Sequence, residues 1–413
     1  MILLSAARIV TPDTVLQPGT VVVEGNRIAE VRPDRLPEAR DLGDATLVPG
    51  FVDVHVHGVD GVDALMTAGG VARMARAFPK YGVTAFCPTA VACPPNELRQ
   101  LLADVASARA AREPQSARVL PAHLESNFIN PEYCGAQPRW YLRQPAAVEA
   151  PVQGAFGTEG APQGAFTWRR PSAAGEFTSA DVLNEIASAS SDVGIVTLAP
   201  ELPGALELIQ DLARAGHRVS LGHSGATYDQ GLAAVRAGAC HATHLFNRMP
   251  PFSHRAPGLV GAIFDSGDVT AELIADGHHV HPAMARAAIR LLGFDRAVAV
   301  SDGTAVSSLG VGAVAQLGSE AITAGADVAR LHDGTWAGSV ATMASVFRTV
   351  TRLYGCGLVE AARLCSTNPA RRMNAPFGRL APDAPADFVV LGPDLEVLET
   401  FVDGVRVWPT REP

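Results

Sequence analysis

Short stretches in which apolar and polar residues alternate stand near both ends of the chain. They cover residues 19–24, 27–32, 386–391 and 400–407. Alternation with a period of two is typical of β-strands that bury one face. Neither end holds enough strands for a stable sheet of its own. We therefore predict that residues 1–48 and 380–413 combine into one small β-sandwich domain.

The middle of the chain, residues 49–379, follows a different pattern. Apolar runs of strand length alternate there with alanine-rich stretches, and the periodicity is helical at residues 206–215, 231–237 and 283–292. Repeated β–α units of this kind close into a parallel barrel. The sequence therefore predicts an α/β fold, a (β/α)8 barrel of the TIM type that carries the β-sandwich. A length of 413 residues fits one barrel plus a small satellite domain.

One segment of the predicted barrel breaks the alternation. Residues 146–175 are rich in Gly, Ala, Pro and Gln and show little periodicity. A long irregular loop inside a compact domain is usually a lid, a binding loop or a disordered insert. We expect this insert to shape the substrate site rather than the fold.

The charge balance narrows the kind of partner. The formal net charge is -9 and basic runs are scarce, which argues against nucleic acid or an anionic membrane as the main partner. No apolar run approaches a membrane span, and the amino end lacks the basic leader of a signal peptide. We expect a cytoplasmic protein that binds a small molecule. The six cysteines include no close-spaced pair, so a thiolate zinc site is not indicated.

Two histidines stand at the end of a predicted barrel strand. In the segment Pro49-Gly-Phe-Val-Asp-Val-His-Val-His, His55 and His57 are two residues apart. Residues i and i+2 of a strand point to the same face, so both imidazoles can reach one ion. A His-X-His pair alone is a weak signal. It gains weight because barrel enzymes keep their chemistry at the carboxyl ends of the strands.

Four more imidazole or carboxylate groups end apolar runs in the same way, namely Glu125, His223, His244 and Asp302. Each alone could be a hydrogen-bonded strand terminus. Together with the histidine pair, they occupy five separate strand ends, which is better explained by a shared site. Nitrogen and oxygen ligands of this kind are selected by zinc and related divalent ions. The sequence therefore predicts a metal centre at the barrel rim.

Several motifs, in order along the chain, resemble those of the N-acetylglucosamine-6-phosphate deacetylases in the amidohydrolase superfamily. They are His-X-His after Pro-Gly-Phe-Val-Asp, His-Leu-Glu125, Gly-His223-Ser, Thr-His244-Leu-Phe-Asn-X-Met-Pro, Asp-Gly-X-His279-Val, Ser-Asp302 and Ala337-Gly-Ser. The resemblance covers nearly the whole chain. It implies a metal-dependent enzyme that hydrolyses the N-acetyl amide of an amino sugar. N-acetylglucosamine 6-phosphate is the first candidate substrate, with glucosamine 6-phosphate and acetate as products.

The resemblance also implies which residues hold the metal. Glu125, His223 and His244 would bind the principal ion, which is expected to be zinc. His55 and His57 would bind a second ion that not every member of the family keeps. One or two ions per chain are therefore expected.

Asp302 matches the catalytic aspartate of the family, and we expect it to act as general base and then as general acid. Many relatives in the wider superfamily bridge two ions with a carbamylated lysine. The only lysine here, Lys80, lies in a helical stretch far from any strand end, so Glu125 would do any bridging.

By the same resemblance, the residues expected to contact the substrate are Ala136, Gln137, Asn247, Arg248, Arg255, His279, Ala337 and Gly338. Arg255 matches a residue that the neighbouring subunit contributes, so a homodimer is implied. Gln137 stands where the family has a histidine that helps to polarise the carbonyl group, and its amide can donate a hydrogen bond but carries no charge. Arg248 replaces a small residue and adds a cation beside the expected phosphate.

Other polar residues near these motifs have weaker assignments. Asp53 shares a strand face with His55 and is interpreted as a group that orients an imidazole. His123 shares a face with Glu125 and is interpreted as a partner of the ligands, whereas His241 has no placement that favours a function. Among the histidines at 278, 279 and 281, one is expected only to cap a helix.

Several alternatives stay open at this point. A different N-acetylated amino sugar, with or without phosphate, fits the same reaction. A hydrolase of a cyclic amide or a dipeptide would use the same barrel, but the bridging lysine expected of it is missing. A non-catalytic relative is the hypothesis from another class, although such proteins usually lose metal ligands.

Overall fold

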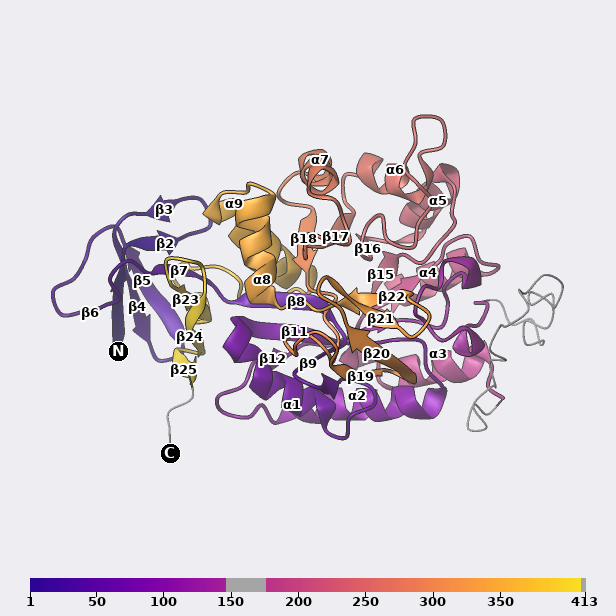
Figure 1. Ribbon diagram of the computed structural model, residues 1–413, viewed down its shortest axis with the longest axis horizontal. Coiled ribbons are helices and arrows are strands. Elements are labelled where there is room, and N and C mark those ends of the chain that lie inside the picture. Colours follow the sequence, from indigo (N-terminus) through magenta and orange to yellow (C-terminus); the bar gives the residue numbers. More distant parts are fainter. Residues whose placement is uncertain (146–175, 410–413) are drawn as a thin grey trace.

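The computed structural model describes residues 1–145 and 176–409. The predicted insert, residues 146–175, lies outside the described residues, so its expected role stays a prediction. Figure 1 shows two parts of different architecture, a small body of β-strands at the left and a larger body of strands and helices at the right.

The small body is a β-sandwich built from both ends of the chain. One sheet has the order β5-β4-β1-β6 and the other has the order β25-β24-β23-β7-β2-β3. Apolar side chains from both sheets, among them Leu4 and Phe388, form a core of their own. The strands are β1 (Ile2–Ala6), β2 (Arg8–Val10), β3 (Val15–Leu16), β4 (Gly19–Glu24), β5 (Arg27–Arg32), β6 (Arg40–Asp41), β7 (Thr46–Pro49), β23 (Phe388–Leu391), β24 (Val397–Val402) and β25 (Val405–Trp408).

The pairing of β7 with β23 joins the two chain ends in one sheet, with Val48 opposite Val389. The prediction that both ends build one small β-domain is confirmed. Its boundaries at 1–48 and 380–413 stay predictions.

The described residues form a barrel of eight parallel strands. They are β8 (Phe51–Val56), β11 (Val83–Ala90), β13 (Ala122–Glu125), β14 (Val193–Leu198), β15 (Arg218–Leu221), β16 (His241–Ala242), β17 (Thr270–Ile274) and β18 (Ala297–Val300). Neighbours along the chain pair with one another, and β12 (Arg118–Val119) extends the pairing of β11. Gly303, just beyond β18, bridges to Val56 of β8 and nearly closes the ring. The predicted (β/α)8 barrel is confirmed.

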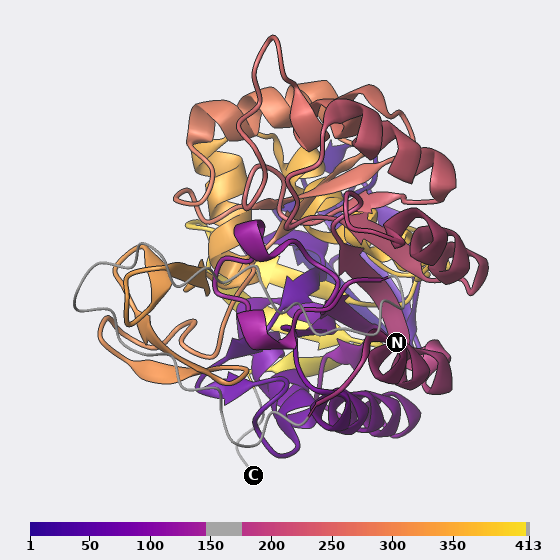
Figure 2. The same ribbon diagram turned by 90° about the vertical axis from the view of Figure 1, so that its right-hand side faces the viewer.

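Helices surround the barrel strands, as Figure 2 shows from the side away from the β-sandwich. They are α1 (Gly70–Ala77), α2 (Pro95–Ala110), α3 (Ser179–Ser188), α4 (Ala205–Arg214), α5 (Tyr228–Ala237), α6 (Gly258–Asp265), α7 (Pro282–Leu292), α8 (Met343–Arg348), α9 (Leu358–Ala362) and α10 (Asn368–Arg372). The helices expected at 206–215, 231–237 and 283–292 correspond to α4, α5 and α7. Local signals fix their ends, since a capping box of Thr227 and Gln230 starts α5 and Gly238 follows it with a φ of 122°.

An antiparallel sheet that was not predicted from the sequence follows β18. Its strands are β19 (Val314–Leu317), β20 (Glu320–Ala324), β21 (Val328–Leu331) and β22 (Trp336–Ser339), drawn in orange at the left of Figure 2. Gly338 in β22 has a φ of 79°, and a Cβ there would lie 2.9 Å from the carbonyl oxygen of Asp302. Glycine therefore allows β22 to lie directly against the turn that carries Asp302.

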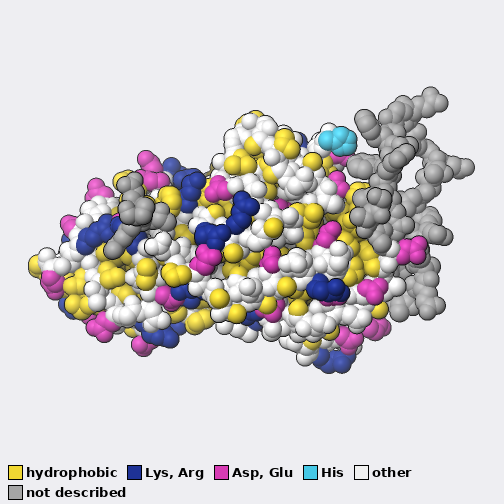
Figure 3. All heavy atoms as spheres, turned by 90° about the horizontal axis from the view of Figure 1, so that it is seen from below, with side chains coloured by type: hydrophobic (Ala, Val, Ile, Leu, Met, Phe, Trp, Pro, Cys, Tyr) yellow, Lys and Arg dark blue, Asp and Glu magenta, His cyan; other side chains and the backbone are white. Residues whose placement is uncertain are grey.

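The surface drawn in Figure 3 carries mixed charges, and the cysteines form no disulfide among the described residues. On the face drawn in Figure 3, basic side chains lie among acidic ones. No helix of the described residues is long and apolar enough to span a membrane. All six cysteines are free thiols.

Candidate metal centre

Sharp turns at the strand ends aim the candidate ligands at one another. His55 lies in β8 and Glu125 ends β13, whereas His223, His244 and Asp302 each stand two residues beyond a strand. These last three residues have positive φ angles of 48°, 28° and 47°, a backbone conformation that non-glycine residues rarely adopt. Strained backbone of this kind concentrates at functional sites. The turn bends each side chain from its strand toward the barrel mouth.

Glu125 is the hub of the first group of ligands. Its Oε1 lies 2.8 Å from Nε2 of His223 and 2.8 Å from Nε2 of His244. The two imidazole nitrogens are 3.0 Å apart. All three side chains are buried, so one ion could contact all three.

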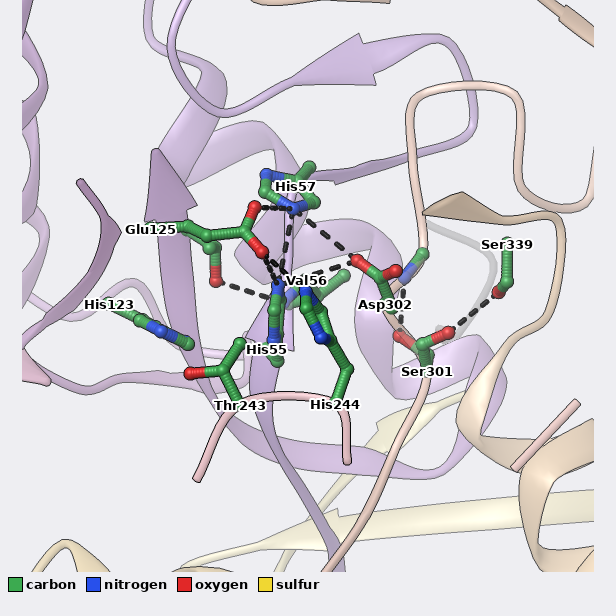
Figure 4. Close-up of polar contacts among 12 residues, drawn as sticks. His55, Val56, His57, His123, Glu125, Thr243, His244, Ser301, Asp302 and Ser339 are labelled. Carbon is green, nitrogen blue, oxygen red and sulfur yellow. Dashed lines mark hydrogen bonds and ion pairs between the residues drawn. The ribbon is translucent and has the colours of Figure 1, made fainter. Parts of the chain in front are cut away.

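The histidine pair and Asp302 form a second group beside the first (Figure 4). Nε2 of His55 and Nε2 of His57 are 3.3 Å apart, and each lies 3.4 Å from Oδ1 of Asp302. Oε2 of Glu125 lies 3.5 Å from Nε2 of His57. Glu125 therefore lies between the two groups and contacts both of them.

The hydrogen bonds on the far side of two rings test whether this donor set fits a metal. Nδ1 of His223 lies 2.8 Å from the carbonyl oxygen of Tyr133, which can only accept. The ring proton is therefore on Nδ1, and the Nε2 lone pair faces Oε1 of Glu125. Nδ1 of His55 faces Glu272 at 2.8 Å in the same way. Lone pairs that face carboxylate oxygens call for a cation between them, so the residues fit a divalent ion.

The electrostatics of the cluster agree with this assignment. Burial would lower the pKa of His55, but the carboxylates of Glu272, Asp302 and Glu125 outweigh it and raise the pKa to about 10. Burial would raise the pKa of Glu125, but His223, His244 and His55 hold it well below its usual range. The carboxylates therefore stay ionised and hold positive charge in the site. That charge is the second ring proton of His55 when no ion is bound, and it would be the ion itself when one is bound.

A cavity of about 470 Å³ opens above these groups, a size suited to a small molecule. His57, Glu125, His223, His244 and Asp302 line its floor. Seven of the residues expected to contact substrate also line it, namely Ala136, Gln137, Asn247, Arg248, His279, Ala337 and Gly338. Arg255 does not line the cavity, because it lies on an exposed loop that follows the cavity wall.

Gln137 and Arg248, the two departures from the family motifs, have well-defined surroundings. Gln137 accepts a hydrogen bond from the backbone N–H of Ala92 at 2.7 Å, and its amide nitrogen donates to Oε2 of Glu125. It is therefore committed to the hub carboxylate rather than free to turn. Arg248 is exposed at the cavity and passes so close to Gly135 that a Cβ there would lie 2.5 Å from its Nε. A glycine at 135 leaves room for that guanidinium.

His279 and His281 make different contacts, and one of them caps a helix as expected. His279 lines the cavity and bonds through Nδ1 to Asp276 at 2.6 Å, whereas the side chain of His281 caps α7. Trp336 of β22 packs edge-on against His279 with ring centroids 5.1 Å apart and also lines the cavity.

The role assigned to Asp53 from the sequence changes. The interpretation that Asp53 orients an imidazole is wrong, because its carboxylate bonds to Ser301 and to the backbone N–H of His55. The carboxylate that bonds to Nδ1 of the His55 ring is Glu272, which is part of none of the motifs. The sequence did contain a signal for Glu272, because it is a charged residue in the middle of the strand Thr270-Ala-Glu-Leu-Ile. Carboxylates are seldom fully buried without partners.

Comparison with known proteins extends over nearly the whole chain. Residues 46–407 match the model of the Amidohydrolase family. The chain is 36% identical to N-acetylglucosamine-6-phosphate deacetylase of Rattus norvegicus, over 96% of this chain and 90% of the relative. It is 31% identical to N-acetylgalactosamine-6-phosphate deacetylase of Escherichia coli O157:H7, over 97% of this chain and 98% of the relative.

A solved structure shares the same architecture. The chain superimposes with a TM-score of 0.85 and 32% identity on N-acetyl-D-glucosamine-6-phosphate deacetylase from Mycobacterium smegmatis, covering 98% of this chain and 99% of that chain. That structure is of an aspartate-to-alanine mutant in complex with N-acetyl-D-glucosamine-6-phosphate.

Proposed function

Because the chain belongs to the amidohydrolase family, we propose that it hydrolyses the N-acetyl amide of N-acetylglucosamine 6-phosphate to glucosamine 6-phosphate and acetate. The observation that carries this proposal is the convergence of Glu125, His223, His244 and Asp302 on the floor of one cavity. Three of these residues offer metal ligands, and the fourth offers a proton acceptor within the same few ångströms.

Glu125, His223 and His244 would hold the principal ion, and His55 with His57 would hold a second one. We propose zinc, because buried imidazole and carboxylate ligands are the set that zinc favours. A divalent ion held there would polarise an amide carbonyl and lower the pKa of water. The ligands serve this chemistry by leaving one side of the site open to the cavity.

Asp302 is the proposed proton carrier. Burial would raise its pKa, but His55 and His57 outweigh burial and lower it, so the carboxylate is ionised and able to accept a proton. Its backbone is fixed on both sides, since its N–H bonds to the carbonyl of His55 at 3.0 Å and its carbonyl accepts from Ser339 at 2.8 Å. Asp302 would take a proton from the attacking water and return it to the departing amine.

The remaining wall of the cavity would bind the sugar. Asn247, Arg248 and His279 offer hydrogen-bond donors there, and cationic donors suit a phosphate. Ala136, Ala337 and Gly338 offer backbone groups and close approach. Gln137 spends one amide hydrogen on Glu125, so any help that it gives to the acetyl carbonyl comes from the other hydrogen.

Arg255 enters this proposal through a second subunit. It lies on an exposed loop of residues 250–256 rather than in its own cavity, which is where a residue would lie that reaches a neighbour. We propose a homodimer in which each Arg255 contacts the substrate bound by the other subunit. A phosphorylated substrate is charged and crosses membranes poorly, so the cytoplasm is the proposed location.

One experiment tests the substrate directly. Purified zinc-loaded protein is assayed for acetate release from N-acetylglucosamine and N-acetylgalactosamine, each with and without a 6-phosphate. The largest kcat/KM is expected for N-acetylglucosamine 6-phosphate. N-acetylgalactosamine 6-phosphate is the second candidate, because a deacetylase of that name is 31% identical over almost the whole chain. Acetate release from none of the four compounds would contradict the proposal.

A further inference from the structure

A single buried carboxylate lies directly beneath the proposed metal centre. Glu272 stands in the middle of β17, and none of its side chain is exposed. It does not line the cavity, so it cannot touch a substrate there. Its function must be exerted through the residues that it contacts.

Those contacts reach ligands from two different strands. Oε2 of Glu272 lies 2.8 Å from Nδ1 of His55 and accepts the backbone N–H of His244 at 3.1 Å. Oε1 lies 3.1 Å from Nε2 of His241, whose Nδ1 bonds to Thr270 at 2.6 Å. One carboxylate oxygen therefore joins a ligand of the second ion to a ligand of the principal ion.

Each of these contacts has a specific consequence for the ligand. A carboxylate accepts and cannot donate, so Nδ1 of the His55 ring keeps its proton and Nε2 is the nitrogen left to bind an ion. His244 adopts a φ of 28°, and such strained backbone persists only where its surroundings hold it. The bond from its N–H to Glu272 is one such restraint.

We propose that Glu272 is a positioning residue that fixes the tautomer of His55 and the turn of His244, and so sets the affinity of both metal positions together. The proposal rests on the metal ligands named under the proposed function. Outer partners of metal-bound imidazoles typically change metal affinity by about 10–100-fold when they are removed.

The test is the metal affinity of Glu272→Gln, measured without substrate by competition between the protein and a chelator for Zn²⁺. Glutamine keeps the shape, but its one carbonyl oxygen carries no full charge and its amide group donates. We expect zinc affinity to fall about 10–100-fold. Thr270→Val is the matched control, because it lies in the same strand and removes a bond to His241 without touching either ligand. Its zinc affinity should equal that of the wild type.

A merely structural role gives a different result. In that case Glu272→Gln would lower the melting temperatures of the zinc-free and zinc-loaded proteins equally while binding zinc as tightly as the wild type, and the proposal would be overturned. Glu272→Asp should recover part of the affinity, since it keeps the charge. If the wild type itself binds no divalent ion, the proposed function fails before this inference is reached.

The wild type offers a test that does not depend on the folding of a variant. In zinc-loaded protein labelled with ¹⁵N-histidine, the ring of His55 should carry its proton on Nδ1. A proton on Nε2 of His55 instead would overturn the proposal.

Discussion

Two buried glutamates at the barrel core, Glu125 and Glu272, have similar partners and different surroundings. Each forms hydrogen bonds with two imidazoles, and neighbouring histidines hold the pKa of each carboxyl well below its usual range. We call the group of Glu125, His223 and His244 the open cluster, and the group of Glu272, His55 and His241 the closed cluster. Only the open cluster lines the cavity with all its members.

The nitrogens of the two clusters differ in their remaining partners. In the closed cluster, both nitrogens of His241 bond to protein groups, and the neighbouring His123 bonds to Val54 and Thr197. In the open cluster, the Nε2 atoms of His223 and His244 face only Glu125 and each other. A reactive metal site needs ligands that are held firmly and one side that is left open. Satisfied hydrogen bonds therefore distinguish His241 and His123 from the proposed ligands His223 and His244, although the residue types are the same.

The largest effect should come from removing the proposed proton carrier in the cavity, Asp302. Asp302→Asn keeps the shape of the side chain but removes its ability to accept a proton. We expect turnover of the best substrate to fall by about 10⁴-fold, the upper end of what general acid–base groups contribute. Wild type and variant are compared at equal metal content. A loss smaller than about tenfold would show that another group moves the proton.

Removing a ligand should break the open cluster and spare the closed one. Zinc at 100 times its Kd should stabilise the wild type by about 2.7 kcal/mol, whereas His244→Ala should gain almost nothing from the same zinc and lose its activity. Unfolding by denaturant with and without zinc measures this difference. His241→Gln is the counterpart in the closed cluster, and it should lower stability equally with and without zinc. Full activity with bound metal in His244→Ala would contradict the ligand assignment.

A smaller effect should follow from Gln137→Leu, because Gln137 ties Glu125 to the backbone of Ala92. Leucine leaves the buried Ala92 N–H without a partner, which costs about 1–3 kcal/mol of the free energy of unfolding. The exposed Gln316→Leu is the control, and a change within about 0.5 kcal/mol is expected there. Equal stability of the two variants would mean that the hydrogen bonds of Gln137 do not stabilise the position of Glu125.

The smallest effect should come from His217, a buried histidine that has no carboxylate partner within residues 1–145 and 176–409. Burial lowers its pKa from the ordinary value of 6.5, although its bond to the Val193 carbonyl opposes the shift. The folded protein therefore binds fewer protons than the unfolded chain as the pH falls through 6.5. The stabilising contribution is present above that pH and is lost below it. The melting temperature of His217→Gln should fall less on mild acidification than that of the wild type, and parallel curves would contradict this expectation.

The parts of the site that were predictable from the sequence are those with a local signal. His55, Glu125, His223, His244 and Asp302 each follow an apolar run, and parallel barrel strands bring such ends to one rim. The same local signals indicated the strands of the β-sandwich and several helices. Periodicity and strand ends are properties of neighbouring residues, so they are visible before the fold is known.

The missed features depend on which strands pair and in what register. Glu272 meets His55 only because β17 and β8 lie on either side of β18 in the closed ring and both side chains point inward, and no motif records that approach. Asp53 was assigned the role of Glu272 because it is close to His55 along the chain, whereas its carboxylate turns toward Ser301. The β19–β22 sheet was missed for a related reason, since its short strands gain stability only against the rim beside β18.

Stability and activity make opposite demands on the left-handed turns at His223, His244 and Asp302. Each such turn costs of the order of 1–3 kcal/mol, which glycine at the same position would relieve. In a mutant library selected for heat resistance alone, we expect these codons to drift toward glycine or asparagine, because the inactive proteins would be the more stable ones. Only selection for turnover would keep the three side chains in the gene.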